Sequence, residues 1–113
     1  MSSQKEKGFN IILSQKIDIL QELQVPTISM FYGIIIRMFY MDSQRHSSPH
    51  LHIEYQGMKS IISIPDGEML EGELPNKKLR LVQAWITIHE EEIMANWQLA
   101  VNGEPIFKID PLR

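Results

Sequence analysis

Three of the four histidines in this chain fall within seven residues, in the segment HSSPHLHIEYQG that runs from His46 to Gly57. His50 and His52 are one residue apart, so on a β-strand both imidazoles project from one face, with Cα atoms about 6.5–7 Å apart. Glu54 continues that face. Such a set could share a metal ion, or it could transfer protons, since the ordinary pKa of histidine is about 6.5.

A metal site at His50, His52 and Glu54 is the less favoured interpretation, because a lone His-x-His fixes little of the ligand geometry. The cupin metal motif resembles this segment only at His-x-His, since the glutamate of that family lies farther along the chain than Glu54. We therefore assign no metal and no cofactor. A polar sheet face without catalytic duty is the simplest alternative.

Metal-free cleavage of RNA needs a base, an acid and a cation near the phosphate. His50 and His52 could transfer the protons, with Arg37 or Arg45 as the cation. The net charge of -3 and the lack of a dense basic run weigh against a nucleic-acid substrate. An arginine in an apolar segment needs a carboxylate partner or an exposed edge, so pairing of Arg37 with Glu54 is an equally good account.

Four further residues are assigned to binding rather than to reaction: Glu54, Ser63, Arg45 and His89. His89 lies on an apolar helical stripe, where a half-buried, hydrogen-bonded histidine is the more ordinary state. The compact basic cluster at 77–80 starts a predicted helix, at the end where the dipole favours negative charge.

The composition is that of one ordinary globular domain, with 113 residues, 43% of them hydrophobic and 22% charged. The absence of cysteine excludes a disulfide framework, a thiolate nucleophile and a cysteine-type zinc site. The longest apolar run, at about 34–41, contains Arg37 and is too short to cross a bilayer. The first ten residues lack the order of a signal peptide. We expect a cytoplasmic protein with no membrane association.

The N-terminal part predicts a helical arm at residues 1–25, followed by a single α+β domain at 26–113. Apolar residues at 9–24 recur at the spacing of an amphipathic helix. Residues 25–33 predict a connector, because proline and glycine interrupt the pattern. Residues 34–41 are apolar at alternating positions on both sides, which predicts a strand covered on both faces.

Residues 50–67 predict a β-hairpin with Gly57 and Met58 as its two-residue turn. In that register Tyr55 lies opposite Ser60. The apolar face then holds Leu51, Ile53, Tyr55, Ser60, Ile62 and Ile64. The other face holds His50, His52, Glu54, Ile61 and Ser63.

The C-terminal part predicts an edge strand at 68–74, then helix from Pro75 to Val101, either as one long helix or as two broken near His89. The tail at 104–113 could add one more strand. The fold class is therefore α+β, with a small antiparallel sheet of three to four strands packed by C-terminal helices and an N-terminal amphipathic helix.

Five separated blocks occur in order between about Pro26 and Leu112: Pro26–Ser29, Gly33–Met38, Pro49–His52, Glu71–Pro75 and Trp85–Trp97. Together they resemble the bacterial domain of unknown function family 4160. The resemblance implies a small bacterial protein with no activity to carry over, often encoded beside a small uncharacterised protein of antitoxin-like character. By analogy, it suggests a toxin-antitoxin hypothesis.

The leading functional hypothesis is therefore a partner-binding component of a toxin-antitoxin-like module, whose partner is a small protein encoded next to it. One alternative is a metal-independent endoribonuclease toxin that acts on RNA with His50, His52 and Arg37. The other is a metal-binding enzyme at the same patch. Whether the chain is an enzyme, and whether it forms a homo-oligomer, stay open.

Overall fold

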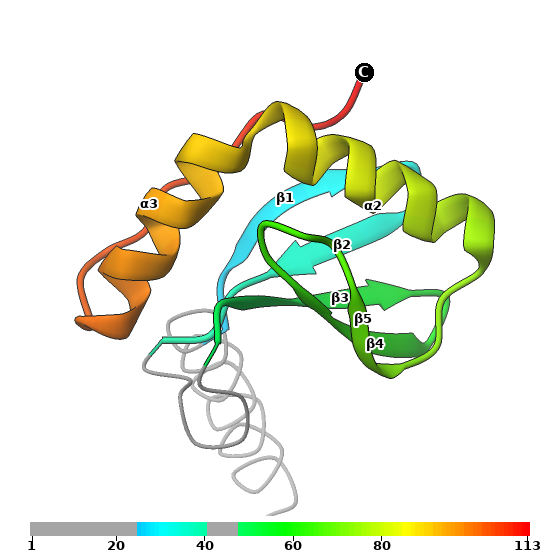
Figure 1. The fold of residues 1–113 in the computed structure, drawn as a ribbon, viewed down its shortest axis with the longest axis horizontal. Helices are drawn as coiled ribbons and strands as arrows, with labels where there is room; N and C mark the ends of the chain where they lie inside the picture. Colours follow the sequence, from blue (N-terminus) through cyan, green and yellow to red (C-terminus); the bar gives the residue numbers. More distant parts are fainter. Residues whose placement is uncertain (1–24, 41–47) are drawn as a thin grey trace, which may run out of the picture.

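The structure, a computed structural model, describes residues 25–40 and 48–113. They form an α+β fold with a five-stranded antiparallel sheet whose strands neighbour one another in chain order (Figure 1). The strands are β1 (Thr27–Phe31), β2 (Ile34–Arg37), β3 (His50–Tyr55), β4 (Met58–Ser63) and β5 (Met69–Gly72). The α+β class is confirmed, with five strands in place of the expected three to four. The predicted arm at 1–25 lies almost wholly outside the described residues.

The additional strand is β1, which replaces the expected connector at 25–33. Tyr32 and Gly33 both have left-handed backbone conformations, with φ of 50° and 78°, and they form a two-residue turn into β2. Two successive residues with positive φ are the signature of the type I′ turn, whose twist matches that of the flanking strands. Pro26 and Gly33 thus flank a short strand.

Strand β2 ends at Arg37, earlier than expected, and only one of its faces is fully covered. Ile34 and Ile36 are buried, whereas Ile35 and Arg37 are half-exposed. The expectation of a strand covered on both faces was therefore wrong among the described residues.

The turn between β3 and β4 consists of Gln56 and Gly57, whose φ angles of 47° and 80° again make a type I′ turn. Tyr55 therefore lies opposite Met58, and the register differs by two residues from the expected one. Because side chains alternate with a period of two, this difference leaves every residue on its predicted face. The predicted alternation is therefore correct although the predicted turn was wrong, but His50 is buried against Trp97 and does not point away from the core as expected.

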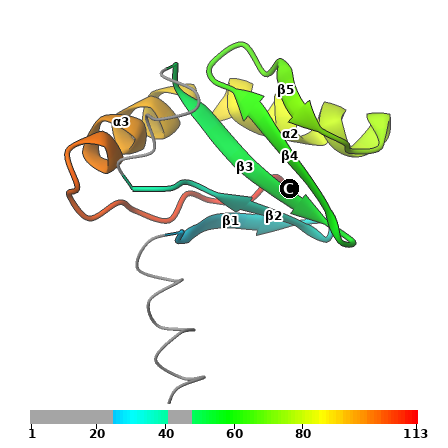
Figure 2. The same cartoon turned by 90° about the horizontal axis from the view of Figure 1, so that it is seen from below.

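The C-terminal helical stretch forms two helices, α2 (Asn76–Ile88) and α3 (Glu90–Val101), which are separated at His89. Of the two expected alternatives, the structure therefore has two helices and not one long helix. Seen from below, α2 passes behind β4 and β5, and α3 lies beside the start of β3 (Figure 2). The two helices bury the apolar face of the sheet in one core, whose members from the sheet include Ile34, Ile36, Leu51, Ile53 and Ile62, and from the helices Val82, Trp85, Ile86, Ile93 and Trp97. No helix in the described ranges is long and apolar enough to span a membrane.

The tail at 104–113 forms no strand, contrary to the expected additional one. It passes β1, where the amide of Ile109 donates one hydrogen bond to the carbonyl oxygen of Ile28 (2.8 Å). Two helix side chains hold it: the indole Nε1 of Trp85 donates to the carbonyl oxygen of Asp110 (2.8 Å), and Asn96 bonds to the backbone of Phe107. Side-chain anchors therefore take the place of strand pairing.

Candidate functional site

The sheet face opposite α2 and α3 carries the charged residues of β2 to β5, and we call it the open face. Its members in the paired strands are Met30, Ile35, Arg37, His52, Glu54, Lys59, Ile61 and Glu71. Cross-strand partners share a face, so Arg37, His52 and Ile61 form one row across the sheet, continued by Glu71. The alternation of β3 thus places two of the predicted site residues, His52 and Glu54, beside Arg37.

Arg37 and Glu54 form an ion pair, with Nε of the arginine 3.5 Å from Oε1 of the glutamate. Their side chains are 24% and 34% exposed. The Nη1 group of Arg37 also donates a hydrogen bond to the carbonyl oxygen of Val25 (3.1 Å). The arginine that interrupts the apolar run is therefore accommodated by a carboxylate and a backbone carbonyl, as burial of a charge requires.

His52 packs on Phe39, the second residue after β2. The two rings are stacked, with centroids 3.8 Å apart and planes 17° apart. The stack holds the imidazole against the sheet close to Arg37, its cross-strand partner. Phe39 lies in the apolar run at 34–41, where the sequence predicts a covered strand, so nothing in the pattern marks it as a site residue.

His50 has a different environment from His52, although both lie on β3. It is only 1% exposed, and its ring lies 5.1 Å from that of Trp97 in α3 and 5.2 Å from that of His52. Its Nδ1 lies 2.8 Å from the carbonyl oxygen of Ser48. A carbonyl only accepts, so Nδ1 carries the proton and donates. His50 therefore belongs to the packed end of the sheet.

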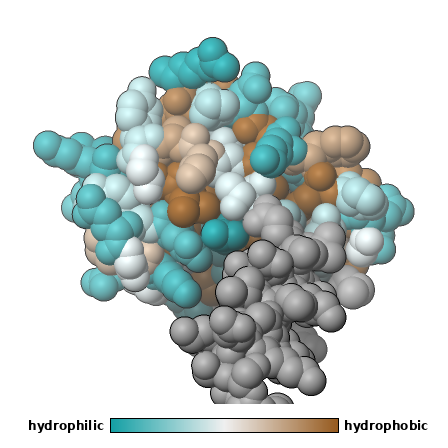
Figure 3. All heavy atoms as spheres, turned by 180° about the vertical axis from the view of Figure 1, so that it is seen from behind, coloured by the Kyte–Doolittle hydropathy of each residue, from teal (hydrophilic) through white to brown (hydrophobic). Residues whose placement is uncertain are grey.

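A hollow of about 360 Å³ lies on the open face. Side chains that line it include Phe39, His52, Glu54, Lys59, Ile61 and Glu71. An aromatic stack, an aliphatic group and charges of both signs thus meet in one depression. The surface seen from behind likewise shows hydrophobic areas set between hydrophilic side chains (Figure 3).

The other predicted binding residues lie elsewhere. Ser63 donates a hydrogen bond to Oδ1 of Asp66 (2.7 Å) and accepts one from the amide of Glu68 (3.1 Å), which orders the turn after β4. His89 lies between the helices, with Nδ1 2.9 Å from Oε1 of Glu92. Arg45 lies outside the described residues.

The described residues contain no group of three or more histidine, cysteine, aspartate or glutamate side chains that could hold a metal ion. Within the expected set, Glu54 pairs with Arg37 while His50 is packed against Trp97. The open face therefore offers recognition by charge, stacking and apolar contact, with His52 and Glu54 as its titratable groups beside Arg37.

Residues 33–98 match the family model described as a domain of unknown function, DUF4160. No curated protein and no solved structure matches the chain. The matched region includes β2 to β5, α2 and most of α3, and with them every named member of the open face except Met30. Because the match covers more than half of the sequence, the chain belongs to the DUF4160 family.

Proposed function

We propose that this protein is a partner-binding component of a bacterial toxin-antitoxin-like module and that it binds a small protein partner through the open face. One observation carries the proposal: the helices pack on one face of the sheet, while the hollow on the other face combines Phe39 and Ile61 with charged side chains. Protein interfaces commonly join apolar contacts with paired charges in this way.

The balance of charge at the hollow favours a protein over a polyanion. Among the described residues, the cations of the open face are Lys59 and Arg37, and its anions are Glu54 and Glu71. Nucleic-acid sites carry an excess of positive charge that neutralises phosphates. A protein partner with charges of both signs can complement both pairs at once.

The test is co-purification of the full chain with the small protein encoded beside its gene, followed by titration calorimetry of the pair. Ile61→Glu places an unpaired charge at the centre of the open face and should weaken binding tenfold or more. Ile88→Glu is the matched control, since Ile88 is 64% exposed on α2 and lies off the open face. Loss of binding in both variants or in neither would overturn the proposal, provided that circular dichroism shows both to be folded.

A second candidate function is metal-independent cleavage of RNA, and it is supported by the grouping of Arg37, His52 and Glu54 on one face. In this reaction Glu54 would accept the proton of the 2′-hydroxyl as it attacks phosphorus. His52 would protonate the departing 5′-oxygen, and Arg37 would stabilise the charged phosphorane. Glu54 thus replaces His50 in the expected acid-base pair, since His50 is buried.

This candidate requires cleavage of an oligoribonucleotide in the presence of a metal chelator. The same oligonucleotide with 2′-deoxyribose at the cleaved position should stay intact, and His52→Ala should abolish cleavage. Cleavage that persists on the deoxy substrate, or in the variant, would rule out the mechanism.

A further inference from the structure

Strand β1 forms one edge of the sheet. Edge strands of natural proteins are commonly protected by lysine or other charges, by irregular pairing or by a covering element. The pairing of β1 with β2 shifts between Thr27 and Ser29, and the tail bonds to Ile28, so the edge without such protection begins at Met30. No charged residue occurs from Val25 to Ile36. The opposite edge, β5, carries a charge of this kind at Glu71.

The backbone of Met30 points outward from this edge. Phe31 and Ile34 flank the two-residue turn, so they form a hydrogen-bonded pair, and Ser29 with Ile36 forms the next one. Met30 lies between them, opposite Ile35 in a non-hydrogen-bonded pair. Its N–H and C=O are therefore directed away from β2.

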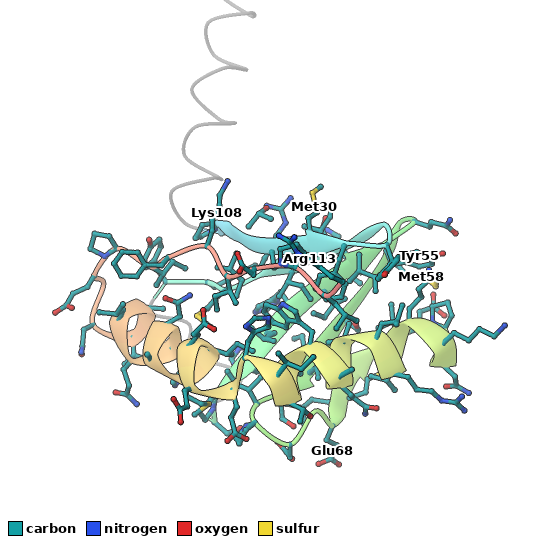
Figure 4. The ribbon with its side chains drawn as sticks, turned by 90° about the horizontal axis from the view of Figure 1, so that it is seen from above. Met30, Tyr55, Met58, Glu68, Lys108 and Arg113 are labelled. Atoms are coloured by element: carbon teal, nitrogen blue, oxygen red, sulfur yellow. The ribbon has the colours of Figure 1, made fainter. Side chains whose placement is uncertain are left out.

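The side chains around Met30 are exposed apolar groups. Met30 is 58% exposed and Tyr32 is 56% exposed. Figure 4 shows Met30 directed away from the helices, on the same side as Lys108 of the tail. Exposed apolar side chains beside backbone groups that no described residue hydrogen-bonds are the features by which an extended chain is added to a sheet.

A groove of about 310 Å³ runs between β1 and the tail, lined by Ser29 and Met30 on one side and by Lys108 and Asp110 on the other. Ser29 is 7% exposed, and its hydroxyl has no hydrogen-bond partner within the part of the chain that the structure describes. A buried hydroxyl without a partner costs free energy that a ligand group could recover. The groove therefore suits a small polar side chain from an added strand.

We infer that the edge of β1 accepts an extended, uncharged segment of a partner protein, which pairs with the backbone of Met30 and places one polar side chain near Ser29. A second copy of this chain fits less well. Two β1 strands paired about a two-fold axis at Met30 would place Ile28 opposite Tyr32 of the other copy, but the carbonyl of Ile28 already accepts from Ile109. A partner segment that ends opposite Met30 does not need that carbonyl. The inference concerns the edge and does not depend on the function proposed for the open face.

The test is a titration of the ¹⁵N-labelled full chain with a short synthetic peptide of alternating threonine and valine, followed by amide chemical shifts. The amides of Ser29, Met30 and Phe31 should shift, while those of Met69 to Gly72 should not. The same peptide with alternate amides N-methylated cannot pair as a strand and should bind at least tenfold more weakly. Shifts of equal size with both peptides, shifts confined to other surfaces, or no shift at β1 would overturn the inference.

Two variants and one control separate edge pairing from other contacts. Met30→Pro removes the outward N–H without removing a ladder bond to β2, and proline is tolerated on edge strands, so the response to the peptide should be lost. Met30→Leu keeps the N–H and should keep the response. Sedimentation of the chain alone should give a monomer. A dimer that Met30→Pro abolishes would assign the edge to a second copy and overturn the inference.

Discussion

The attachment of the C-terminal tail gives the most direct prediction about stability. Asn96 is 2% exposed, and its Nδ2 donates to the carbonyl oxygen of Phe107 (2.7 Å) while its Oδ1 accepts from the amide of Phe107 (3.1 Å). Asn96→Leu keeps a similar volume and removes both hydrogen bonds. Each bond contributes about 0.5–1.5 kcal/mol net, so the variant should lose about 1–3 kcal/mol of unfolding free energy.

No larger penalty is expected, because Phe107 is 68% exposed and its backbone groups can turn to water. Urea unfolding followed by tryptophan fluorescence suits the measurement, since Trp85 and Trp97 are both buried in the core. With an ordinary urea slope of about 1–3 kcal/mol per molar, the midpoint should fall by roughly 1 M. Gln98→Leu is the matched control, because Gln98 is exposed on the same helix and its loss should change stability by less than about 0.5 kcal/mol.

Two results would refute this reasoning. One is an Asn96→Leu variant as stable as the parent chain. The other is a loss of equal size in Gln98→Leu, which would reflect the leucine rather than the tail. Hydrogen exchange adds a local readout: the amide of Phe107 should lose protection in Asn96→Leu, while the amides of α2 keep theirs.

Three further predictions use the same unfolding assay. Gly72→Ala should lose more than about 2 kcal/mol of unfolding free energy, since φ is 82° and the added Cβ would overlap the carbonyl oxygen of Lys59; parent-like stability would show that the backbone between β4 and β5 can shift to make room. Ser60→Ala should gain about 1 kcal/mol, because Ser60 is 4% exposed and its hydroxyl has no partner among the described residues; a loss instead would indicate a bound water. Lys77→Glu should gain about 0.3–1 kcal/mol, because the first turn of α2 has no acidic residue, and the gain should fade in high salt if it comes from the helix dipole.

The sequence could predict which residues of β3 and β4 share a face, because the alternation of side chains along a strand does not depend on which two residues form the turn. Both Gln56-Gly57 and Gly57-Met58 are two-residue turns that contain glycine, and the second has the glycine-first order of a type II′ turn. The structure uses the first, which requires a positive φ at Gln56, an uncommon conformation for glutamine. A register difference of two residues leaves the face of each residue unchanged, so the grouping of His52 with Glu54 was correct.

Strand β1 could not be predicted from its pattern, because its burial does not alternate. Ile28 and Ser29 are both buried, and the pairing with β2 shifts between Thr27 and Ser29. A bulge of this kind places successive side chains out of phase, so a period-two search fails. The turn after β1 carries positive φ at Tyr32, another residue type that rarely adopts it.

The two histidines that suggested the site illustrate the limit of spacing as a signal. Their common face follows from strand geometry, but the burial of His50 depends on Trp97, which α3 brings from far along the chain. No local pattern contains that contact. The stack of His52 on Phe39 likewise depends on the path of the chain after β2.

This difference between the histidines decides how the open face should be tested. A double substitution of His50 and His52 would remove a buried ring that bonds to Ser48 and packs on Trp97, so any loss of binding or activity would include a loss of folding. A substitution of His52 alone removes a half-exposed ring from the hollow and leaves that packing intact. An effect of His52→Ala that exceeds its effect on stability is therefore the measurement that assigns a function to the open face, and His50→Ala is the control for the cost of disturbing the end of the sheet.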